Sequence, residues 1–598
     1  MNRRRRRSTV AVMLLALLAV ICLPVRLLHL QRAITDEDAS TGNNHAITLL
    51  HPKDLSKDLS IPEDNDVLKL LKAFDDAGPL SAPVPRTEIS PYTLDDVISV
   101  LPTFENVVGV VIYDPSADKF ILHYSKHMTW IGGCHKLVSS FQALAHSLRS
   151  MFPERFTTDA AGNSPAELAL ALSSGDYPQV KIGKVGEVDW KTVRRNRNCY
   201  IERKKACVPS DIAPVLQFGS AFKSPVSYPT MITMPMPQNN HVACFETYAA
   251  SKHQKLCPML LPRHRYISGN LQGLVFEETV GLGWDDLIPS VVWRGTDFTY
   301  LHKFYNRLRQ PNFKVDIATK LRKIASDVDV KVAATQAMRD VYYHLVPRWK
   351  SVIWTAEAER EAEEKQKELP EGSDEVIVPW ANMKFAGVMD AGVKKSPSDL
   401  PYYQEFEEYG IPASGETMSL ETLAQYKYHI DTGGGGGTTW SGTLEKLGLP
   451  GLLFHHETPM KDYLHDKMVK WVHYVPIKED LSDLKEKFGW AESHPELAKQ
   501  ISDNATRLAK SLGTHEGFSI MFNEFYDAPL RAVVEAYQPL TLAERDPSWL
   551  DVMVKNDLRP IMQCSGYYSH DCQGLVDDIT FSRAAQVARD IERSERRK

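Results

Sequence analysis

Short apolar runs alternate with helix-like segments along the second half of the chain. Residues 291–293 and 452–454 are short apolar runs typical of a buried strand. Residues 472–476 predict another strand, and residues 480–488 predict a helix. Strands that alternate with helices usually form parallel sheets, because each helix returns the chain across a face of the sheet. A run of Ala, Glu, Lys and Arg near 355–375 predicts a solvated helix or flexible insertion. The pattern therefore predicts an α/β protein.

The 598-residue chain is too long for one compact core and predicts two or more domains. We expect an N-terminal α/β domain over residues 95–285, in which 107–113 and 119–124 predict two strands with a tight connection. A second α/β domain is expected over 286–515 and a C-terminal extension over 516–598. The net charge of -6 provides no basic field to gather nucleic acid, so we expect no nucleic-acid partner.

Five consecutive arginines precede an uncharged apolar stretch at the N-terminus. The positive-inside rule keeps a basic tail, residues 1–8, in the cytosol. The uncharged stretch would span roughly 25 Å as a helix, so we expect a single-pass type II membrane anchor over 9–28. A polar stem would follow over 29–94, with the rest of the chain in the lumen of the endoplasmic reticulum or Golgi. The alternative is a cleaved signal peptide, although residues 23–26 make a poor cleavage site.

The cysteines and one sequon agree with a lumenal chain. Disulfides persist in the lumen, and three near-neighbour pairs are disulfide candidates: Cys199 and Cys207, Cys244 and Cys257, and Cys564 and Cys572. Spacing alone does not fix how they pair. No C-x-x-C motif occurs, which argues against a zinc site. The only N-glycosylation sequon begins at Asn504.

Five consecutive glycines, residues 433–437, are the most unusual motif. Glycine lets backbone amides approach a ligand closely, and a helix that opens near residue 444 would add the N–H donors of an anion site. A flexible linker is the alternative that composition alone favours. The position favours a binding loop, because the run follows the strand-like residues 426–430 and precedes the predicted helix. Neither a Walker loop nor a G-x-G-x-x-G fingerprint is present.

Three stretches in order resemble glycosyltransferase family 90, the protein O-glucosyltransferases and capsule xylosyltransferases. Residues 174–180 are similar to the family's Arg-Asp-Tyr-Pro segment, and 292–296 to its aromatic-Arg-Gly-Ser. The third stretch runs from 426 through 470–477 to 480–484. The resemblance implies a GT-B architecture, in which two Rossmann-like domains face a cleft. It also implies inverting, metal-independent transfer of glucose or xylose from a UDP-sugar to a protein or glycan acceptor, with no cofactor.

The resemblance also implies the site residues. Asp176 stands where the family has its general base, a carboxylate that takes the proton of the acceptor hydroxyl. The residues matched to the nucleotide side are Arg294, Gly295, Thr296, His302, Thr438, Thr439, Trp440, Ser441, Gly442 and Thr443. His302 and Thr443 stand where the family has arginines on the diphosphate, and each lost cation would cost about 1.5 to 3 kcal/mol. The glycine amides, Lys303, Arg307 or Arg309 could compensate.

An Asp-x-Asp at Asp327 and Asp329 resembles the pattern by which many transferases hold a divalent ion. Residues 326–332 alternate polar and apolar side chains, which predicts a surface strand with both aspartates toward solvent, so we expect no metal. The replaced arginines leave a second hypothesis, a catalytically weak family member that acts as a lumenal binding or structural protein. A lumenal hydrolase is a third, and it would need a suitably spaced carboxylate pair.

Overall fold

A computed structural model describes residues 60–79, 89–100, 108–125, 141–173, 213–233, 277–323, 328–512, 528–539 and 558–560, with gaps inside several of these ranges, and also Ile520 and Glu524. The predicted cytosolic tail and membrane anchor, residues 1–28, lie outside this part of the chain. None of the helices that the structure describes is long and apolar enough to cross a membrane.

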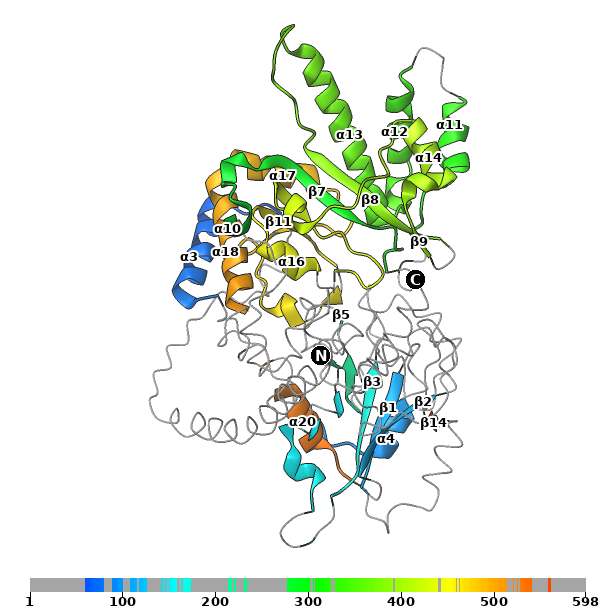
Figure 1. The fold of residues 1–598 in the computed structure, drawn as a ribbon, viewed down its shortest axis with the longest axis vertical. Helices are drawn as coiled ribbons and strands as arrows, with labels where there is room; N and C mark the ends of the chain where they lie inside the picture. Colours follow the sequence, from blue (N-terminus) through cyan, green and yellow to red (C-terminus); the bar gives the residue numbers. More distant parts are fainter. Residues whose placement is uncertain are drawn as a thin grey trace, which may run out of the picture. The chain divides into compact units, whose positions relative to one another are not determined.

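A six-stranded sheet forms the centre of the second α/β region (Figure 1). Its order is β13 (Val475–Ile477), β11 (Leu452–His456), β10 (Tyr426–Ile430), β7 (Ile288–Thr296), β8 (Ala381–Asp390) and β9 (Val393–Lys395). All neighbours pair in parallel except β8 and β9. The predicted parallel sheet is therefore confirmed, and the expected strands at 291–293 and 452–454 lie within β7 and β11.

The order of the strands defines a switch point. β7 comes first in the chain and lies between β8 and β10, so the chain winds outward from β7 in both directions. This is the doubly wound order 2-1-3-4-5, in which ligands bind beyond the carboxyl ends of the first and third strands. Here that position lies beyond β7 and β10.

Helices flank the sheet because their apolar faces need cover. The helices of this region are α10 (Glu277–Val280), α11 (Thr319–Leu321), α12 (Val330–Arg339), α13 (Pro347–Glu368), α14 (Pro401–Glu408), α15 (Leu420–Leu423), α16 (Gly442–Gly448), α17 (Leu484–Ser493) and α18 (Pro495–Leu512). A π-helical turn, Phe313–Ala318, precedes α11. Trp349 of α13 is completely buried between the rings of Phe385 and Tyr403, and this cluster fixes α13 on the sheet.

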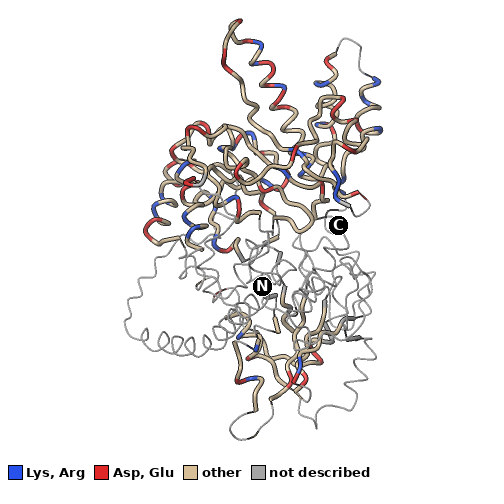
Figure 2. Tube along the Cα trace, viewed as in Figure 1, with Lys and Arg blue, Asp and Glu red and all other residues tan. Residues whose placement is uncertain are grey.

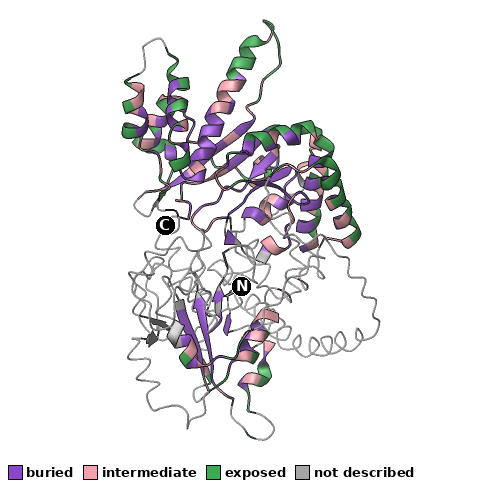
Figure 3. Ribbon diagram, turned by 180° about the vertical axis from the view of Figure 1, so that it is seen from behind, coloured by how far each residue is buried: buried purple, intermediate pink, exposed green. Residues whose placement is uncertain are grey.

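The charged run near 355–375 is the outer part of α13 and the turn after it. The first turns of α13 are buried and its last turns are exposed (Figure 3). Figure 2 shows acidic and basic residues interspersed along this projecting end. Arg360 and Glu364 form one i,i+4 ion pair there, at 2.8 Å. The expectation of a solvated helix thus holds for the outer half of α13, while its inner half belongs to the core.

A second six-stranded sheet lies in the first α/β region. Its order is β14 (Leu558–Pro560), β2 (Lys119–Ser125), β1 (Val108–Asp114), β3 (Leu168–Ser173), β4 (Val215–Gln217) and β6 (Met231–Thr233). β1 and β2 form the predicted tightly connected pair, with Asp114 opposite Lys119. β3, β4 and β6 are parallel, and the other pairs are antiparallel. The shorter elements β5 (Ser220–Ala221) and β12 (Met460–Lys461) pair with each other.

Parts of the predicted C-terminal extension join this first region. β14 pairs with β2. After α20 (Ala528–Ala536), Tyr537 packs edge to face against Tyr92, just before α4 (Leu94–Val100), with the ring centroids 5.4 Å apart. The Tyr537 hydroxyl donates to Glu167 Oε1 at 3.0 Å. These contacts join residues far apart in the sequence, so no local sequence pattern predicts them.

A helix occupies part of the segment expected to be a polar stem. Residues 64–77 form α3 (Asp64–Ala77), whose Val67, Leu71 and Phe74 are buried at helical spacing. Val67 and Leu71 join the core of the second region, and the Phe74 ring meets His473 edge to face at 4.6 Å. This part of the predicted stem is therefore folded onto the second sheet region.

Replacing Leu71 with alanine should destabilise the protein by about 2 to 5 kcal/mol, because it leaves a cavity under α3. Leu71 is 3% exposed, whereas Leu68 on the same helix is 45% exposed. Leu68→Ala is the matched control and should change the free energy of unfolding by no more than about 0.5 kcal/mol. Urea unfolding of both variants measures the difference. Equal effects would show that α3 does not pack against the core in solution.

Candidate functional site

Acidic side chains follow the parallel strands at the carboxyl edge of the second sheet. Asp297 comes directly after β7, Asp431 after β10 and Glu457 after β11, while Glu479 follows β13 by two residues. The carboxyl ends of parallel strands lie at one edge of a sheet, so these groups surround the switch point. Each carboxylate is held by donors of the protein itself.

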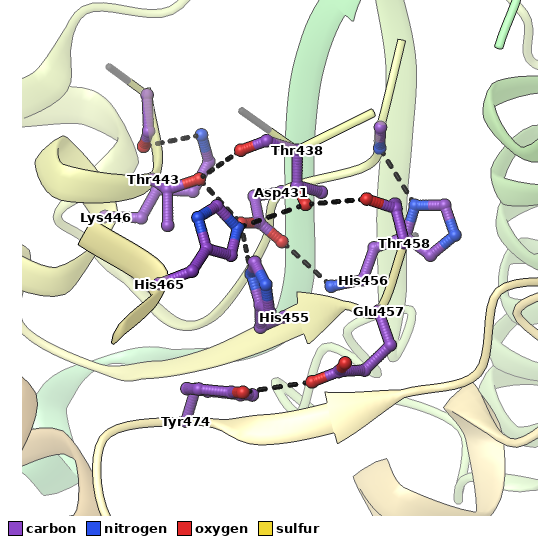
Figure 4. A network of polar contacts seen from close by, with 12 residues as sticks. Asp431, Thr438, Thr443, Lys446, His455, His456, Glu457, Thr458, His465 and Tyr474 are labelled. Atoms are coloured by element: carbon purple, nitrogen blue, oxygen red, sulfur yellow. Dashed lines mark hydrogen bonds and ion pairs between the residues drawn. The ribbon is translucent and has the colours of Figure 1, made fainter. Parts of the chain in front are cut away.

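Asp431 is the centre of a buried polar network (Figure 4). Its Oδ2 atom lies 2.6 Å from His455 Nδ1 and accepts from the Thr443 hydroxyl at 2.8 Å. Its Oδ1 atom accepts from the backbone N–H of His456 at 2.9 Å. Burial alone would raise the pKa of Asp431, but His455 and these hydrogen bonds outweigh it and hold the pKa below its usual value. Asp431 is therefore an anion that ties the exit of β10 to the end of β11.

The glycine run is a packed turn. Gly434 and Gly437 exchange two backbone hydrogen bonds, of 3.0 and 3.1 Å, and the Gly433 N–H donates to His456 Nδ1 at 2.9 Å. Gly437 has a φ of +69°, and a Cβ atom there would lie 2.7 Å from the Thr458 hydroxyl. The run directly joins β10 to a loop that leads into α16, as its position suggested. Three of its five amides donate within the protein, so they are not available to a phosphate.

His456 holds the start of this loop. Because its Nδ1 accepts from Gly433, the proton lies on Nε2, which donates to the Glu479 carbonyl oxygen at 2.8 Å. Burial lowers the pKa of His456 to about 4, so the ring is neutral at physiological pH. A second proton on Nδ1 would break the bond to the loop.

Two tyrosines hold the carboxylate beyond β13. The hydroxyls of Tyr300 and Tyr305 donate to Glu479 Oε1 at 2.6 and 2.5 Å. Burial raises the pKa of Glu479 despite these donors. Lys350 is buried nearby, and burial lowers the pKa of its ammonium group.

The structure brings some of the predicted site residues together. Thr438, Gly442 and Thr443 lie beside the Asp431 network, and Thr296 ends β7 across the switch point. Thr443 is buried with its hydroxyl on Asp431, so it offers neither charge nor a free donor in place of the family arginine.

Arg294 points elsewhere. Its guanidinium donates to the Trp293, Asn382 and Glu416 carbonyl oxygens and to the Asn382 side chain. These partners belong to β7, β8 and the loop after α14. Gly295 is packed under a ring, since a Cβ atom there would lie 2.3 Å from Trp293. Of the cations expected to compensate, Arg309 is paired with Asp316 at 2.6 Å, and Arg307 is exposed.

Several predicted residues lie outside the described part of the chain. They are Asp176, His302, Lys303, Asp327, Thr439, Trp440, Ser441 and the six candidate cysteines Cys199, Cys207, Cys244, Cys257, Cys564 and Cys572. Their roles stay predictions.

The expected surface strand at 326–332 is wrong. Asp329 is the N-cap of α12, and its carboxylate accepts from the N–H groups of Lys331 and Val332 at 2.8 and 3.3 Å. An N-cap aspartate starts a helix by satisfying its first amides, so the alternating pattern spans a helix start. Asn504, the sequon asparagine, lies in α18 and is 5% exposed, so the folded structure leaves little room for a glycan there.

Comparison with known proteins finds a family match for part of the second region. Residues 394–524 match the model of the family described as Glycosyl transferase family 90. This segment belongs to glycosyltransferase family 90. It contains β10, the glycine loop, α16, β11, β13 and the Asp431 network. The resembling stretches at 174–180 and 292–296 precede it.

Similar proteins include protein O-glucosyltransferases. The chain is 34% identical over 100 residues to Protein O-glucosyltransferase 2 of Danio rerio, which is 16% of this chain and 18% of that protein. It is 31% identical over 132 residues to Protein O-glucosyltransferase 3 of Homo sapiens, or 21% of this chain and 23% of that protein. The matched stretches thus span about a fifth of the length of each relative.

Sequence reasoning missed Asp431 and His456. A local signal could have found Asp431, because an acidic residue directly follows the strand at 426–430 as it does the strand at 452–456. The role of His456 depends on a backbone amide that is close only in the folded chain.

Lowering the pH should destabilise this family 90 segment through His456. Its pKa of about 4 in the folded state lies below the ordinary value of 6.5, so the unfolded chain takes up a proton first as the pH falls. The contribution is complete above about pH 6.5 and is lost toward pH 4, and the loss of stability at pH 5 is about 2 kcal/mol. Urea unfolding at pH 7 and pH 5 should therefore show a smaller pH effect for His456→Gln than for the wild type. His344→Gln, at an exposed position, controls for the loss of a histidine. An unchanged pH effect in His456→Gln would contradict the assignment.

Proposed function

We propose that the protein is an inverting, metal-independent glycosyltransferase. It would move glucose or xylose from a UDP-sugar to a hydroxyl of a secretory-pathway protein or glycan. The observation that supports this most strongly is that the family 90 segment supplies the exits of β10, β11 and β13 beside the switch point of a doubly wound sheet. Nucleotides bind at such points.

A GT-B arrangement forms part of the proposal. The second sheet region would carry the sugar nucleotide, and the first would carry the acceptor and Asp176. Asp176 takes the proton of the acceptor hydroxyl while that oxygen attacks the anomeric carbon. The bond from the anomeric carbon to the diphosphate breaks, UDP leaves, and the configuration inverts. Cations and N–H donors near the diphosphate stabilise its growing charge.

The anchor at residues 9–28 would place this chemistry in the lumen of the endoplasmic reticulum or Golgi. The named relatives are protein O-glucosyltransferases, which favours a protein hydroxyl as the acceptor. A lumenal, type II orientation would bring the site to secreted proteins as they pass.

One observation favours the second candidate, a weak or inactive family member that binds rather than transfers. Thr443 is turned inward onto Asp431 and carries no charge. A site without enough cations would bind UDP-sugars and turn them over slowly, because the leaving group gains charge in the transition state. Binding and turnover therefore have to be measured separately.

UDP should stabilise the folded lumenal part of the chain. At 100 times its dissociation constant, a ligand that binds only the folded state adds about 2.7 kcal/mol to the free energy of unfolding. Thermal unfolding with UDP, and with CDP as a control for a general nucleotide effect, measures this. No shift at saturating UDP would exclude both the transferase and the binding-protein candidates for a UDP-sugar.

Asp176→Asn should lower the rate of transfer from UDP-glucose or UDP-xylose by about 100- to 10,000-fold, the usual contribution of a general base. UDP affinity should stay near that of the wild type, because the proposed role of the carboxylate is to accept a proton from the acceptor and not to bind the nucleotide. Asp285→Asn, an exposed aspartate, serves as the control. Equal transfer rates in wild type and Asp176→Asn would remove Asp176 from this role.

A further inference from the structure

Arg348 bridges the two strand exits at the switch point. It is the second residue of α13, after Pro347. Its Nη1 donates to the Thr296 carbonyl oxygen at the end of β7. Its Nε and Nη2 donate to the Thr432 carbonyl oxygen beyond β10, at 3.3 and 3.2 Å. The guanidinium therefore lies at the point where a doubly wound sheet binds its ligand.

This cation has no carboxylate partner among the described residues, whereas Arg309 and Arg339 pair with Asp316 and Glu357. Asp297 acts on Arg348 electrostatically, but its own oxygens accept from the Met389 N–H and the Tyr403 hydroxyl. Burial lowers the pKa of Arg348 to about 10, so it remains charged at neutral pH. Arg348 is thus a half-buried cation whose direct partners are backbone carbonyl oxygens, which favours an external anion at this place.

Trp293 and the glycine run pack directly against the Arg348 guanidinium. The Arg348 Cζ atom lies 5.3 Å from the centre of the Trp293 ring, a cation–π distance. A Cβ atom on Gly434 would lie 2.5 Å from Arg348 Nη2, so the glycine run passes the guanidinium only because it has no side chain there. A guanidinium has five N–H groups, and three of them reach the Thr296 and Thr432 carbonyls. The half-buried fork keeps two N–H groups that no described residue accepts.

We propose that Arg348 binds the diphosphate of the nucleotide-sugar donor and supplies the positive charge that His302 and Thr443 lack. The inference rests on the proposed function. A planar guanidinium matches the oxygens of a phosphate with two parallel hydrogen bonds. The same contact would stabilise the leaving UDP as its charge grows.

A purely structural role makes a different prediction. If Arg348 only joins the segments that follow β7 and β10, its removal should weaken every ligand that binds there to a similar extent. A diphosphate contact would, when removed, weaken UDP and spare uridine, which has the same base and sugar without phosphates. The comparison of these two ligands separates the two roles.

The experiment measures the dissociation constants of UDP and uridine for the wild type, Arg348→Gln and Arg348→Lys. Arg348→Gln should weaken UDP by about 10- to 100-fold, as expected for lost hydrogen bonds to charge, and change uridine less than twofold. Arg348→Lys keeps the charge without the fork and should weaken UDP by a smaller factor, again sparing uridine. Arg360→Gln removes a cation from the outer part of α13 and should leave both constants unchanged.

Equal weakening of UDP and uridine, or no weakening of either, would overturn the assignment of Arg348. If the wild type itself does not bind UDP, the proposed function fails and this inference fails with it. If Arg348→Gln does not fold, the Arg348→Lys variant decides. A purely structural role predicts that this variant weakens UDP and uridine equally, whereas a diphosphate contact predicts that it weakens UDP alone.

Discussion

The parallel pairing of β7 with both β8 and β10 is the constraint on which the site depends. Because the chain winds outward from β7 in both directions, the connections that leave β7 and β10 must diverge and leave a crevice between them. Asp431, the glycine run and Thr296 all belong to segments that leave the sheet at this place. The family 90 match begins only at residue 394, yet the crevice also needs β7 and the start of α13.

Close packing, more than flexibility, explains the five glycines. Arg348 and Thr458 approach the run so closely that a Cβ atom on Gly434 or Gly437 would collide with them. Gly433 is held by the neutral ring of His456, and the Leu301 N–H donates to the Gly434 carbonyl oxygen at 3.2 Å. A loop held by such hydrogen bonds costs little entropy when a ligand binds, because its backbone is already ordered.

The sequence predicted the elements whose signal is local. β7 and β11 each contain a short apolar run, residues 291–293 and 452–454, as strands buried in a parallel sheet do. α3 was hidden because only Val67, Leu71 and Phe74 mark its buried face within a polar segment. β14 depends on pairing with β2, more than 400 residues away in the chain. The bonds of Arg348 go to backbone carbonyl oxygens, which carry no sequence signal, and Asp329 caps a helix inside an alternating pattern.

The proposed diphosphate contact lies near four acidic side chains that follow strands of the sheet, so its charge balance needs an explanation. Each of the four carboxylates is hydrogen-bonded to at least one neighbouring side chain. The pairs are Asp297 with Tyr403, Asp431 with His455 and Thr443, Glu457 with Tyr474, and Glu479 with Tyr300 and Tyr305. The oxygens of each carboxylate thus accept hydrogen bonds from the protein itself, and these bonds fix the segment that follows the strand. Arg348 contributes a positive charge between β7 and β10, held by backbone carbonyls alone among the described residues. The carboxylates hold the ends of the strands, and Arg348 adds a positive charge between β7 and β10, as the proposed diphosphate contact requires.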